Sequence, residues 1–483
     1  MLSRTPTSAN LVGSRREFLS RTGGGMGAIA AAWLLQQDGM VAKAAATSTV
    51  ANPNAVKPSH FAPRARRVIY LFMHGGPSHV DLFDPKPELD RLGGETLPES
   101  FGEVMTRRRV KANPLLPPLR KFRQRGASGL EVSEFLPHMA ELADDLCVLR
   151  GCHGDSVNHP QSVYQMNSGS ILMGKPSVGS WVSYGLGSEN QDMPAFVVLP
   201  DPGGGVKGGP PAWGSGYLPA SYQGTTMRSG KAPLLNLAPP AAVGTDDQLA
   251  MLALLEQENA RHRQRRDNDD ELGARMNTYE LAYRMQTAAP KLVDIDQEPE
   301  YIRKQYGIGQ AETDEFGTRC LLARRLIESG VRFVQLYAGN TVGWDAHENV
   351  EKNHTQMCRR TDQPVAALLR DLKQRGLWDD TLVIWGGEFG RMPMSEQGKG
   401  RDHNPWGYSI VLAGGAVRGG FSYGATDPVG LRAVEGKVHV RDFHATLLHI
   451  LGMDHEALTY FHNGLDERLT GTIEANVVRD ILA

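Results

Sequence analysis

Short apolar runs recur along the chain, and segments with helical spacing of apolar residues lie between them. The run VIYLFM at 68–73 is apolar throughout apart from the hydroxyl of Tyr70, which is typical of a strand buried on both faces of a parallel sheet. We therefore predict a first strand at 66–73. Similar runs predict further strands at 145–151, 195–200, 331–339, 379–390 and 407–415.

Three segments between these strands have the spacing of amphipathic helices. They cover residues 314–330, 361–376 and 439–452. The second is predicted to begin at Thr361, because threonine is a common N-cap residue. Strands that alternate with helices predict an α/β fold with a largely parallel sheet.

The chain divides into a leader, a linker and one main domain. Residues 45–65 are rich in small and polar residues and contain prolines, which is typical of a linker. Residues 66–483 form the predicted α/β domain. Within it, residues 201–313 interrupt the alternation, first with a loop rich in glycine and proline and then with helical sequence. We interpret this stretch as an insertion.

The leader predicts export from the cytoplasm. Arg15 and Arg16 precede a weakly apolar run of about 13 residues at 23–35, which is shorter than the ~20 residues of a membrane span. Ala42-Lys43-Ala44 resembles a cleavage site between small residues. We predict a twin-arginine signal peptide at 1–44, a periplasmic or cell-surface location, and no membrane span in the mature chain.

Charge and cysteine content exclude some classes of function. The chain has 52 lysines and arginines against 54 aspartates and glutamates, so no basic surplus indicates a nucleic-acid partner. The four cysteines form no CxxC pair, which argues against a cysteine zinc site. Cys147 and Cys152 are close in sequence, but sequence alone does not decide whether they pair.

The candidate chemistry lies after the predicted strands. In open α/β sheets, ligands bind beyond the carboxyl ends of the strands. Histidines and carboxylates gather in five such segments, and we predict metal ligands at His74, His79, Asp81, Asp345, His347, Glu388 and His403. Imidazole and carboxylate ligands suit a divalent metal, so we expect zinc, manganese or calcium. The alternative for Glu388 is a structural ion pair with Arg391.

Several of these motifs resemble one protein family. The segments FMHGGPSHVDLFDPKP, GWDAH, TLVIWGGEFGRMP and GRDHNPWGYSIVLAGGAVRGG are similar to the DUF1501 family, and the resemblance runs from about residue 66 to residue 480. That family is abundant in planctomycetes and is grouped with the alkaline phosphatase and sulfatase superfamily. The resemblance implies a three-layer α/β/α sandwich of the alkaline phosphatase type, with His159 at the nucleophile position and His74 in place of an aspartate.

The resemblance also implies an activity. We expect an exported, metal-dependent hydrolase of phosphate or sulfate esters that acts on a small-molecule or glycan substrate. His159 would be nucleophile, ligand or acid, and Arg391 or Arg401 would neutralise the ester anion. No Cys-x-Pro-x-Arg or Cys-x-Ala-x-Arg motif occurs, so a formylglycine mechanism is not expected. The alternative is a non-catalytic cell-surface or glycan-binding protein on a degenerate hydrolase scaffold.

Overall fold

The computed structural model describes residues 52–228, 234, 237, 244–263, 270–340 and 342–483. The predicted signal peptide at 1–44 lies outside these residues. Contacts divide the chain into two units, one formed by residues 52–238 and 273–483 and the other by residues 1–51 and 239–272. Helix α7 (Thr245–Arg263) belongs to the second unit, and helix α8 (Asp270–Val293) begins there and continues into the first.

A nine-stranded sheet forms the centre of the larger unit. Its path runs in the order β12-β4-β11-β8-β1-β7-β5-β6, and β15 pairs with β4. The strands are β1 (Arg67–Met73), β4 (Leu146–His153), β5 (Phe196–Leu199), β6 (Thr225–Thr226), β7 (Phe333–Ala338), β8 (Thr381–Gly386), β11 (Tyr408–Ala413), β12 (Phe421–Tyr423) and β15 (Val438–His439). Only β11 pairs with its neighbours in the antiparallel sense, so the predicted, mostly parallel sheet is confirmed.

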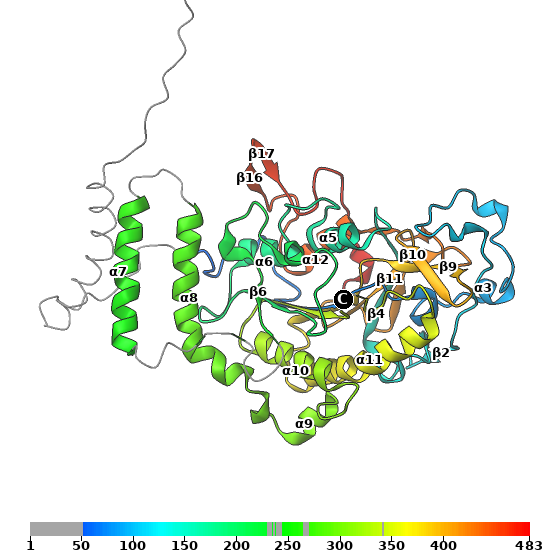
Figure 1. Ribbon diagram of the computed structural model, residues 1–483, viewed down its shortest axis with the longest axis horizontal. Helices are drawn as coiled ribbons and strands as arrows, with labels where there is room; N and C mark the ends of the chain where they lie inside the picture. Colours follow the sequence, from blue (N-terminus) through cyan, green and yellow to red (C-terminus); the bar gives the residue numbers. More distant parts are fainter. Residues whose placement is uncertain (1–51, 229–233, 235–236, 238–243, 264–269, 341) are drawn as a thin grey trace, which may run out of the picture. The chain divides into compact units, whose positions relative to one another are not determined.

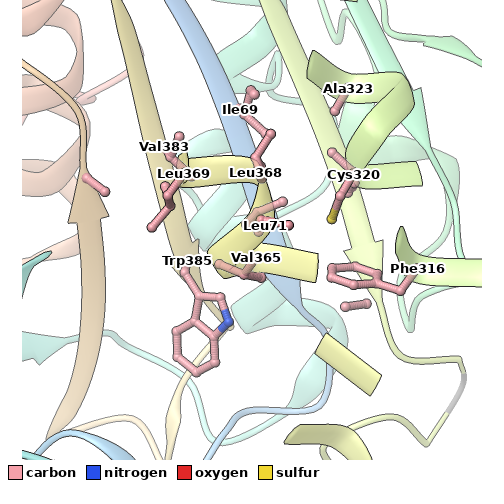
Figure 2. Close-up of a cluster of buried hydrophobic side chains, with 14 of the residues drawn as sticks. Ile69, Leu71, Phe316, Cys320, Ala323, Val365, Leu368, Leu369, Val383 and Trp385 are labelled. Carbon is pink, nitrogen blue, oxygen red and sulfur yellow. The ribbon is translucent and has the colours of Figure 1, made fainter. Parts of the chain in front are cut away.

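Helices cover both faces of this sheet (Figure 1). Strand β1 shows why, because its successive side chains point to opposite faces. Val68, Tyr70 and Phe72 pack in one buried cluster with α5 (His159–Ser168), α6 (Val178–Leu186) and α12 (Val440–Ile450). Ile69 and Leu71 pack in the other cluster with α10 (Asp314–Glu328) and α11 (Val350–Gln374), as Figure 2 shows. The predicted three-layer α/β/α sandwich is therefore confirmed.

The helix predicted to begin at Thr361 begins eleven residues earlier. Helix α11 starts at Val350, and the side chain of Asn349 caps it by accepting a hydrogen bond from Lys352 N at 2.9 Å. Thr361 instead lies inside the helix, where its hydroxyl donates to the Met357 carbonyl. The prediction was wrong because Pro364 suggested a first turn, whereas this proline lies within the long helix.

A buried hairpin was not expected from the sequence. Strands β9 (Gly390–Glu396) and β10 (Gly400–Asn404) pair with each other, and every residue of both strands is buried although many are charged. The remaining short elements are α2 (His79–Leu82), α3 (Pro87–Arg91), α4 (Pro137–Ala140), α9 (Glu300–Gln305) and the strand pairs β2–β3 (Phe122–Arg125, Leu130–Ser133), β13–β14 (Ala425–Thr426, Ala433–Glu435) and β16–β17 (Tyr460–His462, Leu465–Glu467).

Two further features concern the cysteines and the membrane. Cys147, Cys152, Cys320 and Cys358 are all buried free thiols, so Cys147 and Cys152 do not pair. Among the described residues, no helix combines the length and apolar character that a membrane crossing requires.

Candidate metal centre

Four side chains from three parts of the fold converge beside the sheet. Ligand atoms of His159, Asp345, His347 and His403 all lie within 4.8 Å of one another. His159 is the first residue of α5, Asp345 and His347 lie in the loop after β7, and His403 lies on β10. Helix α5, the loop after β7 and the buried hairpin thus each bring one imidazole to the carboxylate of Asp345.

The three histidines share one hydrogen-bond pattern. In each ring, Nδ1 lies 2.6 Å from an oxygen: His159 from Glu388 Oε1, His347 from Glu396 Oε2, and His403 from the backbone oxygen of Val157. Ionised carboxylates and carbonyls only accept hydrogen bonds, so Nδ1 carries the proton in each ring. Nε2 is therefore the nitrogen through which each ring can bind a metal when the imidazole is neutral.

The three Nε2 atoms all face the same carboxylate. His159 Nε2 lies 3.0 Å from Asp345 Oδ2, and the Nε2 atoms of His347 and His403 lie 2.9 Å and 3.1 Å from Asp345 Oδ1. The Nε2 atoms of His159 and His347 are buried, and neither has a hydrogen-bond partner with acceptable geometry. At these distances each Nε2 either donates a hydrogen to Asp345, as His403 Nε2 can at 3.1 Å, or shares a cation with it. The arrangement therefore fits a bound divalent metal.

Charge states around the centre agree with this arrangement. Burial lowers the pKa of His403 well below its usual value, more than Asp345 raises it, so the ring is neutral at pH 7. Burial raises the pKa of Asp345, but contacts with the three histidines and Arg391 outweigh it, and the net shift is far downward. Asp345 is thus an anion in contact with neutral imidazole, the form in which both groups bind metals.

Glu388 orients His159 through a hydrogen bond to Nδ1, the ring nitrogen that does not face Asp345. Besides His159, its carboxylate accepts hydrogen bonds from Gly75 N at 2.9 and 3.1 Å. Burial raises the pKa of Glu388, but His159 and His74 lower it more, so the carboxylate stays ionised. Gly75 has a φ of 112°, and a Cβ there would lie 2.5 Å from Asp345 N. Only glycine fits where β1 and the loop after β7 approach so closely.

Other residues predicted as ligands have partners of their own. His74 uses both ring nitrogens, because Nδ1 lies 2.9 Å from the Asn340 carbonyl and Nε2 accepts from Lys207 N at 3.1 Å. His74 nonetheless lies beside the centre, since its ligand atom groups with those of His159 and Glu388. His79 Nε2 lies 2.8 Å from the Gly430 carbonyl, away from these groups.

Asp81 and Arg401 form a buried ion pair with each other and do not contact the four side chains of the centre. Arg401 Nε lies 2.8 Å from Asp81 Oδ2, and both side chains are fully buried. Arg401 also donates to four backbone carbonyls, which leaves it no hydrogen to offer a substrate. Burial raises the pKa of Asp81, but Arg401 lowers it more, so the pair is ionised.

Arg391 is also committed within the protein. It is fully buried, pairs with Asp345 Oδ1 at 2.8 Å and donates from Nε to the Gly76 carbonyl at 2.9 Å. It therefore touches the centre as a support for Asp345. The ion pair that the sequence suggested between Arg391 and Glu388 is replaced by the pairs Arg391–Asp345 and Glu388–His159.

Sequence reasoning did not identify Lys207 or Glu396, and it noted Asp402 within GRDHNPWG without giving it a role. Lys207 Nζ lies 2.7 Å from Asp345 Oδ2, and its side chain is 27% exposed. It lies in the glycine-rich loop after β5, so the rule that ligands follow strand ends could have found it. Glu396, Asp402 and His347 form another group of ligand atoms within 4.8 Å. No sequence signal marked Glu396, because it lies on the unexpected hairpin.

Comparisons with known proteins give a family and a set of distant folds. A family model described as "Protein of unknown function (DUF1501)" matches residues 65–482. No curated protein matches the chain. Among solved structures, a phosphonate monoester hydrolase from Silicibacter pomeroyi is 11% identical with a TM-score of 0.31, covering 66% of this chain and 69% of that one.

Two further solved structures are similarly distant. The PsFucS1 sulfatase from Pseudoalteromonas sp. is 13% identical with a TM-score of 0.36, over 84% of this chain and 72% of that one. A TAB5 alkaline phosphatase mutant is 9% identical with a TM-score of 0.34, over 81% of this chain and 99% of that one. Likeness at this level carries no argument about activity, which has to come from the site itself.

The buried Asp81–Arg401 pair gives the first prediction. Asp81→Asn leaves Arg401 charged and unpaired in the interior, so the free energy of unfolding should fall by about 3–5 kcal/mol. Urea denaturation followed by circular dichroism measures this change. Asp90→Asn, at an exposed position nine residues away, should change the stability by less than about 0.5 kcal/mol. Equal stability of the two variants would contradict the ion-pair assignment.

Proposed function

This chain belongs to the DUF1501 family, whose function is unknown, and we propose from its site that it is a metal-dependent hydrolase of phosphate or sulfate esters. One observation carries the proposal. Two buried imidazoles and one half-buried imidazole, that of His347, are held by acceptors on Nδ1, and their Nε2 atoms lie 2.9–3.1 Å from the carboxylate of Asp345. A structural core has no need of this costly set of groups.

The donor set favours zinc or manganese. His159, His347 and His403 would each supply Nε2, and Asp345 would supply oxygen. Imidazole nitrogen suits zinc and manganese, whereas calcium prefers a shell made entirely of oxygen. Calcium, which the sequence left open, is therefore the least suited of the three. Glu388 and Glu396 would act as the outer carboxylates that fix ring orientation and make the imidazoles better donors.

A divalent ion held here would act as a Lewis acid and lower the pKa of a bound water towards neutrality. The protein's own groups have defined tasks around it. His159 uses both of its nitrogens, one on Glu388 and one towards Asp345, which supports a ligand role over a nucleophile role. Lys207 is the partly exposed cation at the centre, so it is suited to neutralise the anionic group of an ester.

The alternative is a non-catalytic binding protein on a degenerate scaffold. Its best support is that Arg391 and Arg401, the arginines expected to bind the ester anion, are both fully buried and engaged with protein groups. Lys207 offsets this loss, because it supplies a positive charge directly beside Asp345 at 2.7 Å. A screen for hydrolysis separates the two functions.

Metal content tests the centre directly. After incubation with zinc or manganese and dialysis, we expect the wild type to hold at least one ion per chain by inductively coupled plasma mass spectrometry. Asp345→Ala and His347→Ala each remove a ligand and should hold less than about a tenth as much. His60→Ala, at an exposed position, should bind as the wild type does. A wild type that takes up neither metal would refute the centre.

Hydrolysis tests the activity. We expect the metal-loaded wild type to cleave at least one of p-nitrophenyl phosphate, bis-p-nitrophenyl phosphate and p-nitrophenyl sulfate. Glu388→Gln removes the charge that orients His159, so kcat/KM should fall by about 10- to 100-fold. Glu456→Gln, at an exposed position, should hydrolyse the same ester at the wild-type rate. If the two variants are equally active, Glu388 does not support the reacting site.

We also propose that the protein is exported through its paired arginines. The support is the sequence of residues 1–44, with Arg15-Arg16 ahead of a short apolar run. Replacing both arginines by lysine should abolish export of the full chain and leave it in the cytoplasm, as cell fractionation and immunoblotting would report. Replacing Arg4 by lysine is the matched control. Export of the Arg15→Lys, Arg16→Lys variant at the wild-type level would contradict the proposal.

A further inference from the structure

A run of cationic residues lies against the metal centre. Residues 106–111, with the sequence TRRRVK, form what we call the basic segment. Arg107, Arg108 and Arg109 are all exposed. The whole chain has a net charge of −2, so this concentration of positive charge is local and is not the property of a basic protein.

The backbone and one side chain of the basic segment are attached to the supports of the centre. Arg108 N donates to Asp402 Oδ2 at 2.6 Å, and Asp402 Oδ1 accepts from His403 N at 2.8 Å. Arg108 Nε lies 3.6 Å from Oε1 of Glu396, the residue whose other oxygen holds His347. The segment is therefore joined to two of the three metal-facing histidines through one residue each.

The basic segment is also held by a buried side chain and by a hydrogen bond within the segment. Val110 is buried in a cluster that includes Met392 and Met394 of β9. Its backbone N–H donates to Thr106 Oγ1 at 3.2 Å, which closes the segment into a turn. Arg109 has a φ of 58°, a left-handed conformation that is uncommon outside glycine and that clusters at functional sites. The exposed arginines are thus attached to a backbone that is held by packing and hydrogen bonds.

These arginines are available to a ligand. Among the described residues, Arg107 and Arg109 have no carboxylate within ion-pair distance, whereas Lys111 pairs with Glu103 at 3.5 Å. At the centre itself, Lys207 is the partly exposed cation. An ester with a single anionic group needs only the inner lysine. Two unpaired arginines further out fit additional anionic groups on the same substrate.

We infer, resting on the proposed function, that the substrate is a sulfated or phosphorylated glycan whose neighbouring anionic groups contact Arg107 and Arg109 while one ester lies at the metal centre. Short runs rich in arginine and lysine are suited to such polyanions. A single-stranded nucleic acid fits less well, because its bases stack on aromatic side chains. The chain has no aromatic residue between Phe101 and Phe122, and the two aromatic residues that pack on the cluster of Val110 (Phe101 and Trp406) are half-buried there.

Binding of dextran sulfate tests this inference without requiring turnover. Fluorescence anisotropy with labelled dextran sulfate compares the wild type with the double variant Arg107→Gln, Arg109→Asn; asparagine tolerates the left-handed conformation at 109. We expect about tenfold weaker binding and a slope of log affinity against log salt that is smaller by about two, since each arginine that contacts the polyanion displaces about one of its counterions. Arg91→Gln, at an exposed arginine elsewhere, should leave affinity and slope unchanged.

Further ligands and a turnover assay complete the test. Phosphorylated dextran of the same length decides between sulfate and phosphate as the preferred group, and neutral dextran should not bind. The inference is overturned if the wild type does not bind either charged dextran, if the double variant binds as Arg91→Gln does, or if an oligonucleotide of equal charge binds more tightly than both.

Release of sulfate or phosphate is followed in the same samples and separates the inference from the proposed function. We compare kcat/KM for charged dextran with kcat/KM for the p-nitrophenyl ester. The ratio of the first to the second should be about tenfold lower in the double variant than in the wild type. If the arginine-dependent binding holds but no ester of any kind is cleaved, the hydrolase function fails while recognition of the charged glycan stands.

Discussion

The carboxylate of Asp345 is the interaction on which the rest of the site depends. Its two oxygens face three imidazole nitrogens, the guanidinium of Arg391 and the ammonium of Lys207. These groups come from four segments of the fold, since Arg391 and His403 share the β9–β10 hairpin. One anion therefore joins the loop after β7 to α5, to the β9–β10 hairpin and to the glycine-rich loop after β5. Removing its charge would leave several cationic or polar groups facing one another.

Two outer carboxylates make this convergence possible. Glu388 and Glu396 each accept the Nδ1 hydrogen of one histidine, and so they determine which ring nitrogen faces Asp345. Phe389 adds an apolar wall, because its ring stacks on His403 with centroids 4.5 Å apart. The rings are thus fixed by hydrogen bonds on one side and by packing on the other. Such a pre-oriented set of donors loses little freedom when it binds an ion.

The sequence predicted the sheet well and the site in part. Continuous apolar runs identified β1, β7 and β8 because a strand buried on both faces has no polar positions. The rule that ligands follow strand ends led to Asp345, His347 and Glu388, which the structure brings together. The same rule also selected Asp81 and Arg401, which neutralise each other, since sequence does not show which opposite charges will pair.

The hairpin explains most of what sequence reasoning missed. Strands β9 and β10 are buried yet rich in charged residues, so they lack the apolar pattern on which strand prediction relies. Glu396 was identified, and Asp402 was given a role, only when the fold placed them beside His347 and His403. Resemblance to a family had drawn attention to His403, but not to the acids that hold the region together.

The four buried thiols have a consequence for where this protein can mature. No covalent cross-link holds the described fold, so its stability rests on packing, hydrogen bonds and ion pairs alone. The chain can therefore reach its final structure in a reducing compartment, before any oxidising environment is met. A cofactor that needs folded ligands could then be inserted under cytoplasmic control of metal supply. Under the proposed export, folding and metal binding would precede transport, without a redox step between them.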